Sequence, residues 1–226
     1  MRAIIIKIGL LMISVTLFSQ KSKLDRNDWI YWQNNKPLKY QDFKGRIGGC
    51  GSEIIDDSIK IEVSACLGLW SILDIPKTWK KGVEYERFYF VPVFSVKKSW
   101  AKSNDSIAIL KQQVYFDLNE LAARWARKEL YNLREQSGNA TGTTAIYFAT
   151  ISQQMQEMKK GLYASYFDAV FRTNSLDSLK SWADFTKEML DKTKDFETKE
   201  IEFERIITGQ PEKGYKESKK VIGPFK

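Results

Sequence analysis

Residues 103–138 read SNDSIAILKQQVYFDLNELAARWARKELYNLREQSG, and this stretch decides the fold class. It opens with the capping residues Ser103 to Ser106 and closes at Gly138, which are typical boundaries of a helix. Between these boundaries the apolar residues recur at steps of three and four. They form one stripe: Ile107, Leu110, Val114, Leu118, Leu121 and Trp125. We therefore predict a long helix that packs against a sheet.

The second half of the chain continues with the helical period. A second helix is predicted from about Thr144 to Arg172 and a third from about Leu176 to Lys194. The expected core positions of these two helices are Ile151, Met155, Met158, Leu162, Tyr166 and Val170, and then Leu179, Trp182, Phe185 and Met189. At these spacings the methionines and aromatic residues indicate packing rather than a cofactor site.

The first half of the chain reads as strands and turns. We expect a short aromatic strand over Asp28–Trp32, a half-buried strand from Ile59 that continues in apolar fashion to about Pro76, and a strong strand over Phe88–Val96. Pro92 indicates a bulge or an edge position for the last of these. The predicted fold is α+β: a small, mainly antiparallel sheet from the N-terminal half, packed by three long helices from the C-terminal half.

The composition excludes much of hydrolase chemistry. The 226 residues include no histidine, so Ser-His-Asp and Cys-His catalysis and histidine-ligated zinc are absent. Chemistry that needs no histidine stays open, such as a carboxylate pair acting on glycosides or a Ser-Lys pair.

The N-terminus is predicted to be a signal peptide over residues 1–19, with Arg2 and Lys7 before an apolar run. A retained anchor is the alternative. The predicted single domain spans 20–208, and 209–226 form a basic, loosely ordered tail. We expect an exported protein in the periplasm, at the cell surface or secreted, with no membrane span after cleavage and no nucleic-acid partner.

Cys50 and Cys66 are the only two cysteines. In an oxidising compartment a disulfide between them is favoured over two free thiols. It would join a glycine-rich loop to a strand.

Three short motifs resemble a known family. Leu38–Gly45 (LKYQDFKG), Ser99–Lys102 (SWAK) and Ile109–Leu121 (ILKQQVYFDLNEL) look like a bacterial secreted family, domain of unknown function 922, whose members are expected to be zinc-dependent proteases. The resemblance covers about 29–130, with Tyr40 in place of a family tryptophan. It implies a zincin-like fold, and its further matches are Phe116, Asp117, Glu120, Leu121, Ala123, Arg124 and Arg127.

The departures from this pattern bear on function. In the family's HExxH motif two histidines bind zinc and the glutamate activates water. Lys111, Gln112 and Tyr115 occupy those positions here, so we expect no metal, no cofactor and no catalytic residue. The resemblance implies a vestigial site at Lys111, Gln112, Tyr115, Asp117 and Glu120. In its shallow groove Tyr115 would fill the metal's space and Lys111 would donate to a carboxylate. Alternatively, these are ordinary residues of a helix that never had a site.

Three functions remain open. The first is a non-catalytic relative of a zinc protease, a binding or scaffolding module of the cell envelope that holds an extended peptide or a protein against an edge strand, for which Phe88–Val96 is the candidate. The second is a module that binds envelope glycans or anionic polymers, suggested by seven tryptophans and a charge of +8. The third is a hydrolase with chemistry that does not use histidine.

Overall fold

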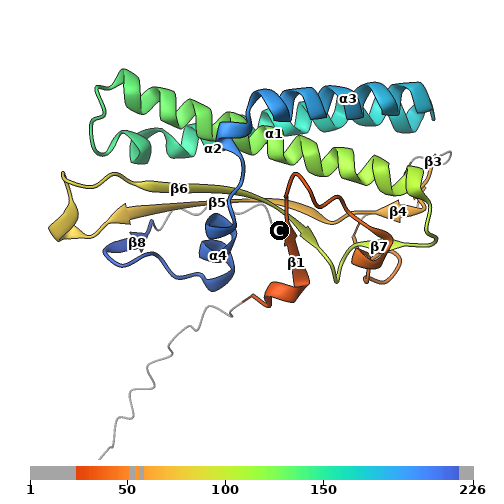
Figure 1. Ribbon diagram of the computed structural model, residues 1–226, viewed down its shortest axis with the longest axis horizontal. Coiled ribbons are helices and arrows are strands. Elements are labelled where there is room, and N and C mark those ends of the chain that lie inside the picture. The colour runs from red at the N-terminus through yellow and green to blue at the C-terminus, as the bar shows by residue number, and fades with distance from the viewer. Residues whose placement is uncertain (1–23, 51–53, 56–58, 219–226) are drawn as a thin grey trace, which may run out of the picture.

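The computed structural model describes residues 24–50, 54–55 and 59–218 and shows an α+β fold (Figure 1). Its main sheet has four antiparallel strands in the order β1-β6-β5-β8. These strands are β1 (Trp29–Tyr31), β5 (Leu67–Pro76), β6 (Arg87–Ser95) and β8 (Tyr215–Glu217). Two small antiparallel ladders join β2 (Ile54–Ile55) to β3 (Ile59–Lys60) and β4 (Val63–Ser64) to β7 (Trp100–Ala101).

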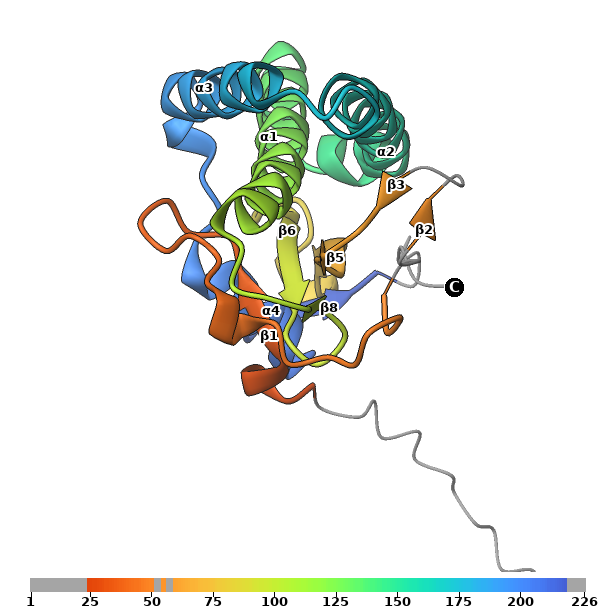
Figure 2. The same cartoon turned by 90° about the vertical axis from the view of Figure 1, so that its right-hand side faces the viewer.

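Long helices cover one face of the sheet, as predicted. They are α1 (Ser106–Gln136), α2 (Thr143–Phe167) with its π-helical extension η4 (Asp168–Arg172), and α3 (Leu176–Lys192). A fourth helix, α4 (Glu200–Thr208), lies on the opposite face of the sheet (Figures 1 and 2). Four 3₁₀ turns complete the described elements: η1 (Arg26–Asp28), η2 (Tyr40–Asp42), η3 (Thr78–Lys80) and η5 (Lys194–Phe196).

Helix α1 is the centre of the molecule because it is buried on two sides. Toward the sheet, Ala122, Ala123 and Ala126 are fully buried against Leu69 and Phe90. These small side chains let the helix approach the strands closely. On its other side, α1 packs on the second and third helices through a separate cluster that includes Val114, Leu118, Tyr166, Val170 and Leu179.

The apolar stripe of α1 is only partly as predicted. Val114 and Leu118 are fully buried, whereas Ile107 and Leu110 are more than two-fifths exposed. At this end of α1 the core contact comes from Ile109 and Ala108 instead, so Ile107 and Leu110 lie on the side of the helix that faces away from the core. The predicted strand from Ile59 is also interrupted, since β3 and β4 are separate short strands and β5 begins only at Leu67.

Strand β6 is internal, so the prediction that it forms an edge is wrong. It pairs with β5 over most of its length and with β1 near its end. Pro92 is tolerated there because β1 ends beside it. Trp32 N donates to the Pro92 carbonyl at 3.2 Å, and the N–H that proline lacks would have pointed to the same side, where β1 ends.

The C-terminal segment is more ordered than predicted. Tyr215–Glu217 forms β8 and pairs with β5, and a buried ion pair between Arg205 and Asp74 ties α4 to the same strand at 2.6 Å. The predicted tail therefore begins inside the folded domain, and residues 219–226 lie outside the described residues. So does the predicted signal peptide over 1–19.

The predicted disulfide is present in the structure. A disulfide joins Cys50 to Cys66 with their Cα atoms 5.4 Å apart, and it links the glycine-rich loop to the start of β5. No helix in the described part of the chain is both long and apolar enough to cross a bilayer.

Candidate functional site

Two of the short sequence motifs meet in space. Gly45 N donates to the Ser99 carbonyl at 2.7 Å, so the segment after η2 lies directly on the turn that leads into β7. A Cβ atom at position 45 would fall 2.7 Å from that carbonyl oxygen, which only glycine avoids. The two motifs thus contact each other, and Phe43 of the first packs in one core cluster with Ile109 and Phe116 of α1.

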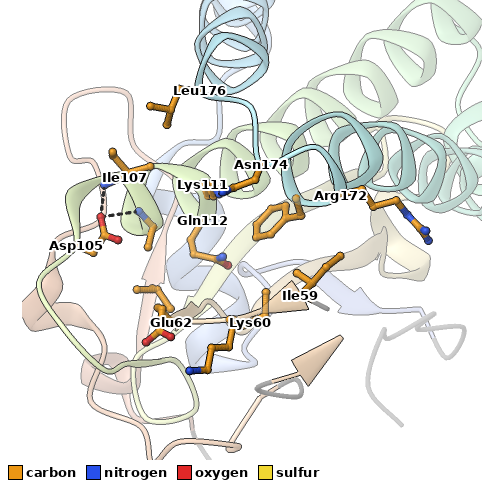
Figure 3. Close-up of a pocket in the computed structure, with 14 residues that line it drawn as sticks. Ile59, Lys60, Glu62, Asp105, Ile107, Lys111, Gln112, Arg172, Asn174 and Leu176 are labelled. Carbon is orange, nitrogen blue, oxygen red and sulfur yellow. Dashed lines mark hydrogen bonds between the residues drawn. The ribbon is translucent and has the colours of Figure 1, made fainter. Parts of the chain in front are cut away.

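The positions that the family resemblance assigns to a zinc site lie on the N-terminal half of α1, beside an open groove. Lys111 donates through Nζ to Asn174 Oδ1 at 3.2 Å, and its ammonium lies 5.1 Å from the centre of the Phe171 ring. Gln112 accepts from Ala65 N at 3.0 Å. Lys111 thus points toward the connection between η4 and α3, whereas Gln112 points toward the segment after β4 (Figure 3).

Two adjoining cavities form this groove, which we call the α1 groove. The larger has a volume of about 660 Å³ and lies between α1, the end of η4 and residues 59–63. The smaller has a volume of about 260 Å³. Ile61, Gln112 and Phe171 line both cavities, so they are parts of one surface.

The smaller cavity has aromatic walls. Tyr115, Tyr163, Phe167 and Phe171 line it together with Leu67. The Tyr115 ring lies 4.6 Å from the Tyr163 ring centre and 5.8 Å from the Phe171 ring centre. Burial raises the pKa of Tyr115 and Tyr163 above the ordinary tyrosine value, so both hydroxyls are neutral.

A strand edge faces the helix across the larger cavity. Lys102 N donates to the Glu62 carbonyl at 2.9 Å, so the backbone groups of Glu62 face the β7 side. In an antiparallel pair successive residues face opposite sides, so the N–H and C=O of Val63 point away from β7. Ala65 N points to the same side as Val63 and donates to Gln112. The outer edge of β4 therefore lies toward α1, and the Gln112 amide already pairs with one end of it.

The charge of Lys111 is not balanced by a carboxylate. Among the described residues its partners are the Asn174 amide and the Phe171 ring, so the expected carboxylate is not one of these residues and stays a prediction. Burial lowers the pKa of Lys111, and the more distant Asp105 partly offsets this effect. Asp105 itself caps α1 by accepting from Ile107 N and Ala108 N.

Asp117 lies outside the groove. It accepts from Trp32 Nε1 at 2.7 Å and from Gln113 Nε2 at 2.8 Å, and Gln113 Oε1 in turn accepts from Leu38 N. Asp117 thus fastens the N-terminal segment to α1. Burial raises its pKa to about 6, although the two hydrogen bonds favour the charged form.

Glu120 is also structural. It is fully buried and accepts from Arg124 Nε at 2.7 Å and from Thr198 N at 2.9 Å. Arg127 donates to the Phe196 and Phe90 carbonyls and to Thr198 Oγ1. This network fixes the segment before α4 against α1, so the structure does not bring Glu120 to Lys111.

The side chains at the motif positions do not fit a zinc ion. Lys111 brings a positive charge, the Gln112 amide oxygen is engaged by Ala65 N, and Glu120 is engaged by Arg124 and Thr198. Among the described residues, no group of three histidine, cysteine, aspartate or glutamate side chains is arranged to hold a metal.

Sequence reasoning missed the residues that complete the groove from outside α1. Phe171 lies on the π-helical η4, a kind of turn that is frequent at functional sites. Asn174 has a positive φ of 49°, a conformation that asparagine tolerates better than most residues. The only signal in the sequence was the break between two helices at Thr173 to Ser175.

Comparison with known proteins gives no relative, because the chain matches no protein-family model, no curated protein and no solved structure.

Proposed function

We propose that the chain is an exported, non-catalytic binding module of the cell envelope, related to zinc proteases, and that its α1 groove holds an extended peptide bearing a carboxylate. The observation that carries this proposal is the Lys111 ammonium, which lies in the wall of a cavity of about 660 Å³ without a carboxylate partner among the described residues.

Charge is the first argument. Within the described part of the chain this partly buried ammonium contacts a neutral amide and a ring, and the more distant Asp105 offsets only part of its loss of water. A ligand carboxylate in the cavity would supply this counter-charge and would raise the pKa of Lys111 back toward its ordinary value. An anionic group is therefore the chemistry that the groove recognises best.

Backbone geometry is the second argument. The outer edge of β4 faces α1 at Val63, and a strand edge can add an extended chain through main-chain hydrogen bonds. This supports β4 as the strand that would pair with the peptide, in preference to β6, which lies between β1 and β5. The aromatic cavity beside it would take one apolar side chain of the same peptide.

The non-catalytic part of the proposal rests on the groove's side chains. Lys111, Gln112 and Tyr115 offer neither a ligand set for zinc nor a base of the kind that activates water there. The hydrolase alternative has less support, because Asp117 and Glu120 are held in structural hydrogen bonds. The glycan alternative has less support because Trp32, Trp70 and Trp100 are core residues.

The test uses the chain from Gln20 onward, which retains every described residue. The protein is immobilised and then exposed to a library of nonapeptides with free carboxyl termini. We expect wild type to capture a subset of peptides. Lys111→Met keeps the length of the side chain and removes its charge, so it should lose that subset. Leu110→Ala changes an exposed neighbour that lines a different cavity, and it should capture the same subset as wild type.

Two results would contradict the proposal. Failure of the wild-type chain to retain any peptide would remove the peptide-binding part. The claim that the protein is non-catalytic would be contradicted if it retained a stoichiometric transition metal after dialysis and cleaved casein in a reaction that a chelator abolishes.

A further inference from the structure

The β5–β6 hairpin ends in the two most exposed large apolar side chains of its region. Trp79, in η3, is 69% exposed and Val83 is 79% exposed. We call residues 77–85 the hairpin tip. A tryptophan normally buries most of its large surface, so one left outside the core on a protruding turn indicates a contact surface.

Hydrogen bonds hold the hairpin tip against β8 and the segment before it, and an ion pair lies within the tip. Glu84 accepts from Lys80 Nζ and, at 2.7 Å, from the Tyr215 hydroxyl. Lys77 N donates to the Gly214 carbonyl at 2.9 Å, which joins the base of the tip to the segment before β8. These contacts hold the turn in one conformation. The Lys80 ammonium lies 4.9 Å from the centre of the Trp79 ring, and Trp79 and Val83 nevertheless stay largely exposed.

Positive charge surrounds these apolar side chains. Lys77 and Lys81 are exposed, and no ion pair joins either to a carboxylate within the described part of the chain. The one carboxylate of the tip, Glu84, is engaged by Lys80 and Tyr215.

A further exposed apolar side chain, that of Ile146, lies at the same end of the molecule. The connection from α1 to α2 lies above the hairpin in Figure 1, and Arg134 near the end of α1 lies 5.0 Å from the Tyr85 ring centre. Ile146, in the first turn of α2, is 72% exposed. The end therefore presents exposed apolar side chains from two elements beside Lys77 and Lys81, which form no ion pair with any described residue.

We infer that this end of the molecule docks on the surface of an anionic phospholipid bilayer, with Trp79 and Val83 entering the headgroup region and Lys77 and Lys81 meeting the phosphates. Tryptophan favours that interface, and lysines near it are attracted to anionic lipids. The surface is separate from the α1 groove, so the inference does not depend on the peptide proposal.

The test measures sedimentation of the chain from Gln20 onward with vesicles of phosphatidylcholine, with and without phosphatidylglycerol. We expect binding to the anionic vesicles that falls as salt is raised, and little binding to the neutral ones. Trp79→Ala combined with Val83→Ser should weaken binding about tenfold or more, because two buried apolar groups are lost. Lys77→Gln combined with Lys81→Gln should also weaken it and should reduce the salt dependence.

The matched control is Ile201→Ser, which removes a side chain that is 70% exposed on α4, on the other face of the sheet, and should bind as wild type does. The inference is overturned if wild type ignores anionic vesicles, or if the Trp79 and Val83 double variant binds them as tightly as wild type. Self-association that the same double variant abolishes, without vesicle binding, would assign the surface to a second copy of the chain instead.

Discussion

At the scale of single residues, two carboxylates of α1, Asp117 and Glu120, lie in different environments. Asp117 is buried beside neutral donors, and its pKa rises to about 6 from an ordinary value of 3.8. Glu120 is buried beside two guanidinium groups, Arg124 and Arg127. Near neutral pH the ionised Asp117 lowers the free energy of unfolding. The ionised Glu120 is part of the network that holds the C-terminal segment.

Asp117→Asn should therefore stabilise the protein at pH 7. Both hydrogen bonds to Asp117 reach the same oxygen, Oδ1, so an asparagine with its oxygen there keeps both donors. Because the folded-state pKa lies above the unfolded one, the wild-type contribution is favourable below about pH 4 and is lost as the pH rises through 6. We expect a gain of up to about 3 kcal/mol at pH 7 from removing this ionisation cost.

Urea unfolding of wild type and Asp117→Asn at pH 4 and pH 7 measures this effect. The difference in unfolding free energy should be largest at pH 7 and should nearly vanish at pH 4. A variant less stable than wild type at both pH values would show that the charged form is needed by the fold.

Glu120→Gln should destabilise strongly. It leaves Arg124 and Arg127 buried without their shared carboxylate and weakens two contacts to Thr198. Breaking a buried ion pair by removing one partner costs about 3 to 5 kcal/mol. The urea midpoint reports this loss, with the exposed Glu188→Gln as a control that changes little. An unchanged midpoint for Glu120→Gln would contradict the structural role.

At the scale of elements, the segment from β3 to the start of β5 forms one wall of the α1 groove. It is held by the disulfide between Cys50 and Cys66 and by the hydrogen bond from Ala65 N to Gln112. Ser64 Oγ also donates to the Cys50 carbonyl at 2.6 Å. The shape of the groove therefore depends on a covalent link between the glycine-rich loop and this segment.

Replacing both cysteines by serine should lower the free energy of unfolding by about 3 kcal/mol, from the loss of a closed loop of 16 residues. Thermal unfolding with and without a reducing agent measures this effect. The reducing agent should lower the melting temperature of wild type and leave that of the double variant unchanged. Equal melting temperatures for wild type in both conditions would contradict the prediction.

Elements with a strong local period were predictable, and elements that depend on distant partners were not. Helix α1 was clear from its spacing and caps, and so were the next two helices. Helix α4 has only nine residues and is held through Phe203, Ile206 and Ile207 against the sheet. Strand β8 has three residues and depends on its pairing with β5.

The candidate site was predictable only on α1. Lys111, Gln112 and Tyr115 do line the groove, because they share one side of a helix whose register the sequence defines. Phe171 and Asn174 come from a distant connection, and local periodicity carries no information about which residues such a connection brings to α1. The internal position of β6 was missed for a related reason, since Pro92 alone does not reveal where β1 ends.

At the scale of the whole molecule, α1 separates the two proposed binding surfaces. The groove lies at Lys111 and the hairpin tip lies near Arg134, which at 1.5 Å per residue are about 35 Å apart along the helix. Substitutions at sites so far apart are expected to act independently. Lys111→Met should leave vesicle binding unchanged, and the Trp79 and Val83 double variant should leave peptide capture unchanged.

Vesicle sedimentation and peptide capture, run on both variants, check this independence. Loss of both activities in either variant, with the fold intact by circular dichroism, would show that the two surfaces are coupled or that one of them is wrongly assigned.

The most direct test of the central claim is a double-mutant cycle on Lys111. A captured peptide is titrated into wild type and Lys111→Met by calorimetry, first with its carboxylate and then with that group converted to an amide. We expect wild type to lose affinity on amidation and Lys111→Met to be insensitive to it, with a coupling energy of about 1.5 kcal/mol or more between the two charges. Equal losses on amidation in both proteins would show that Lys111 does not receive the carboxylate, and would contradict the account.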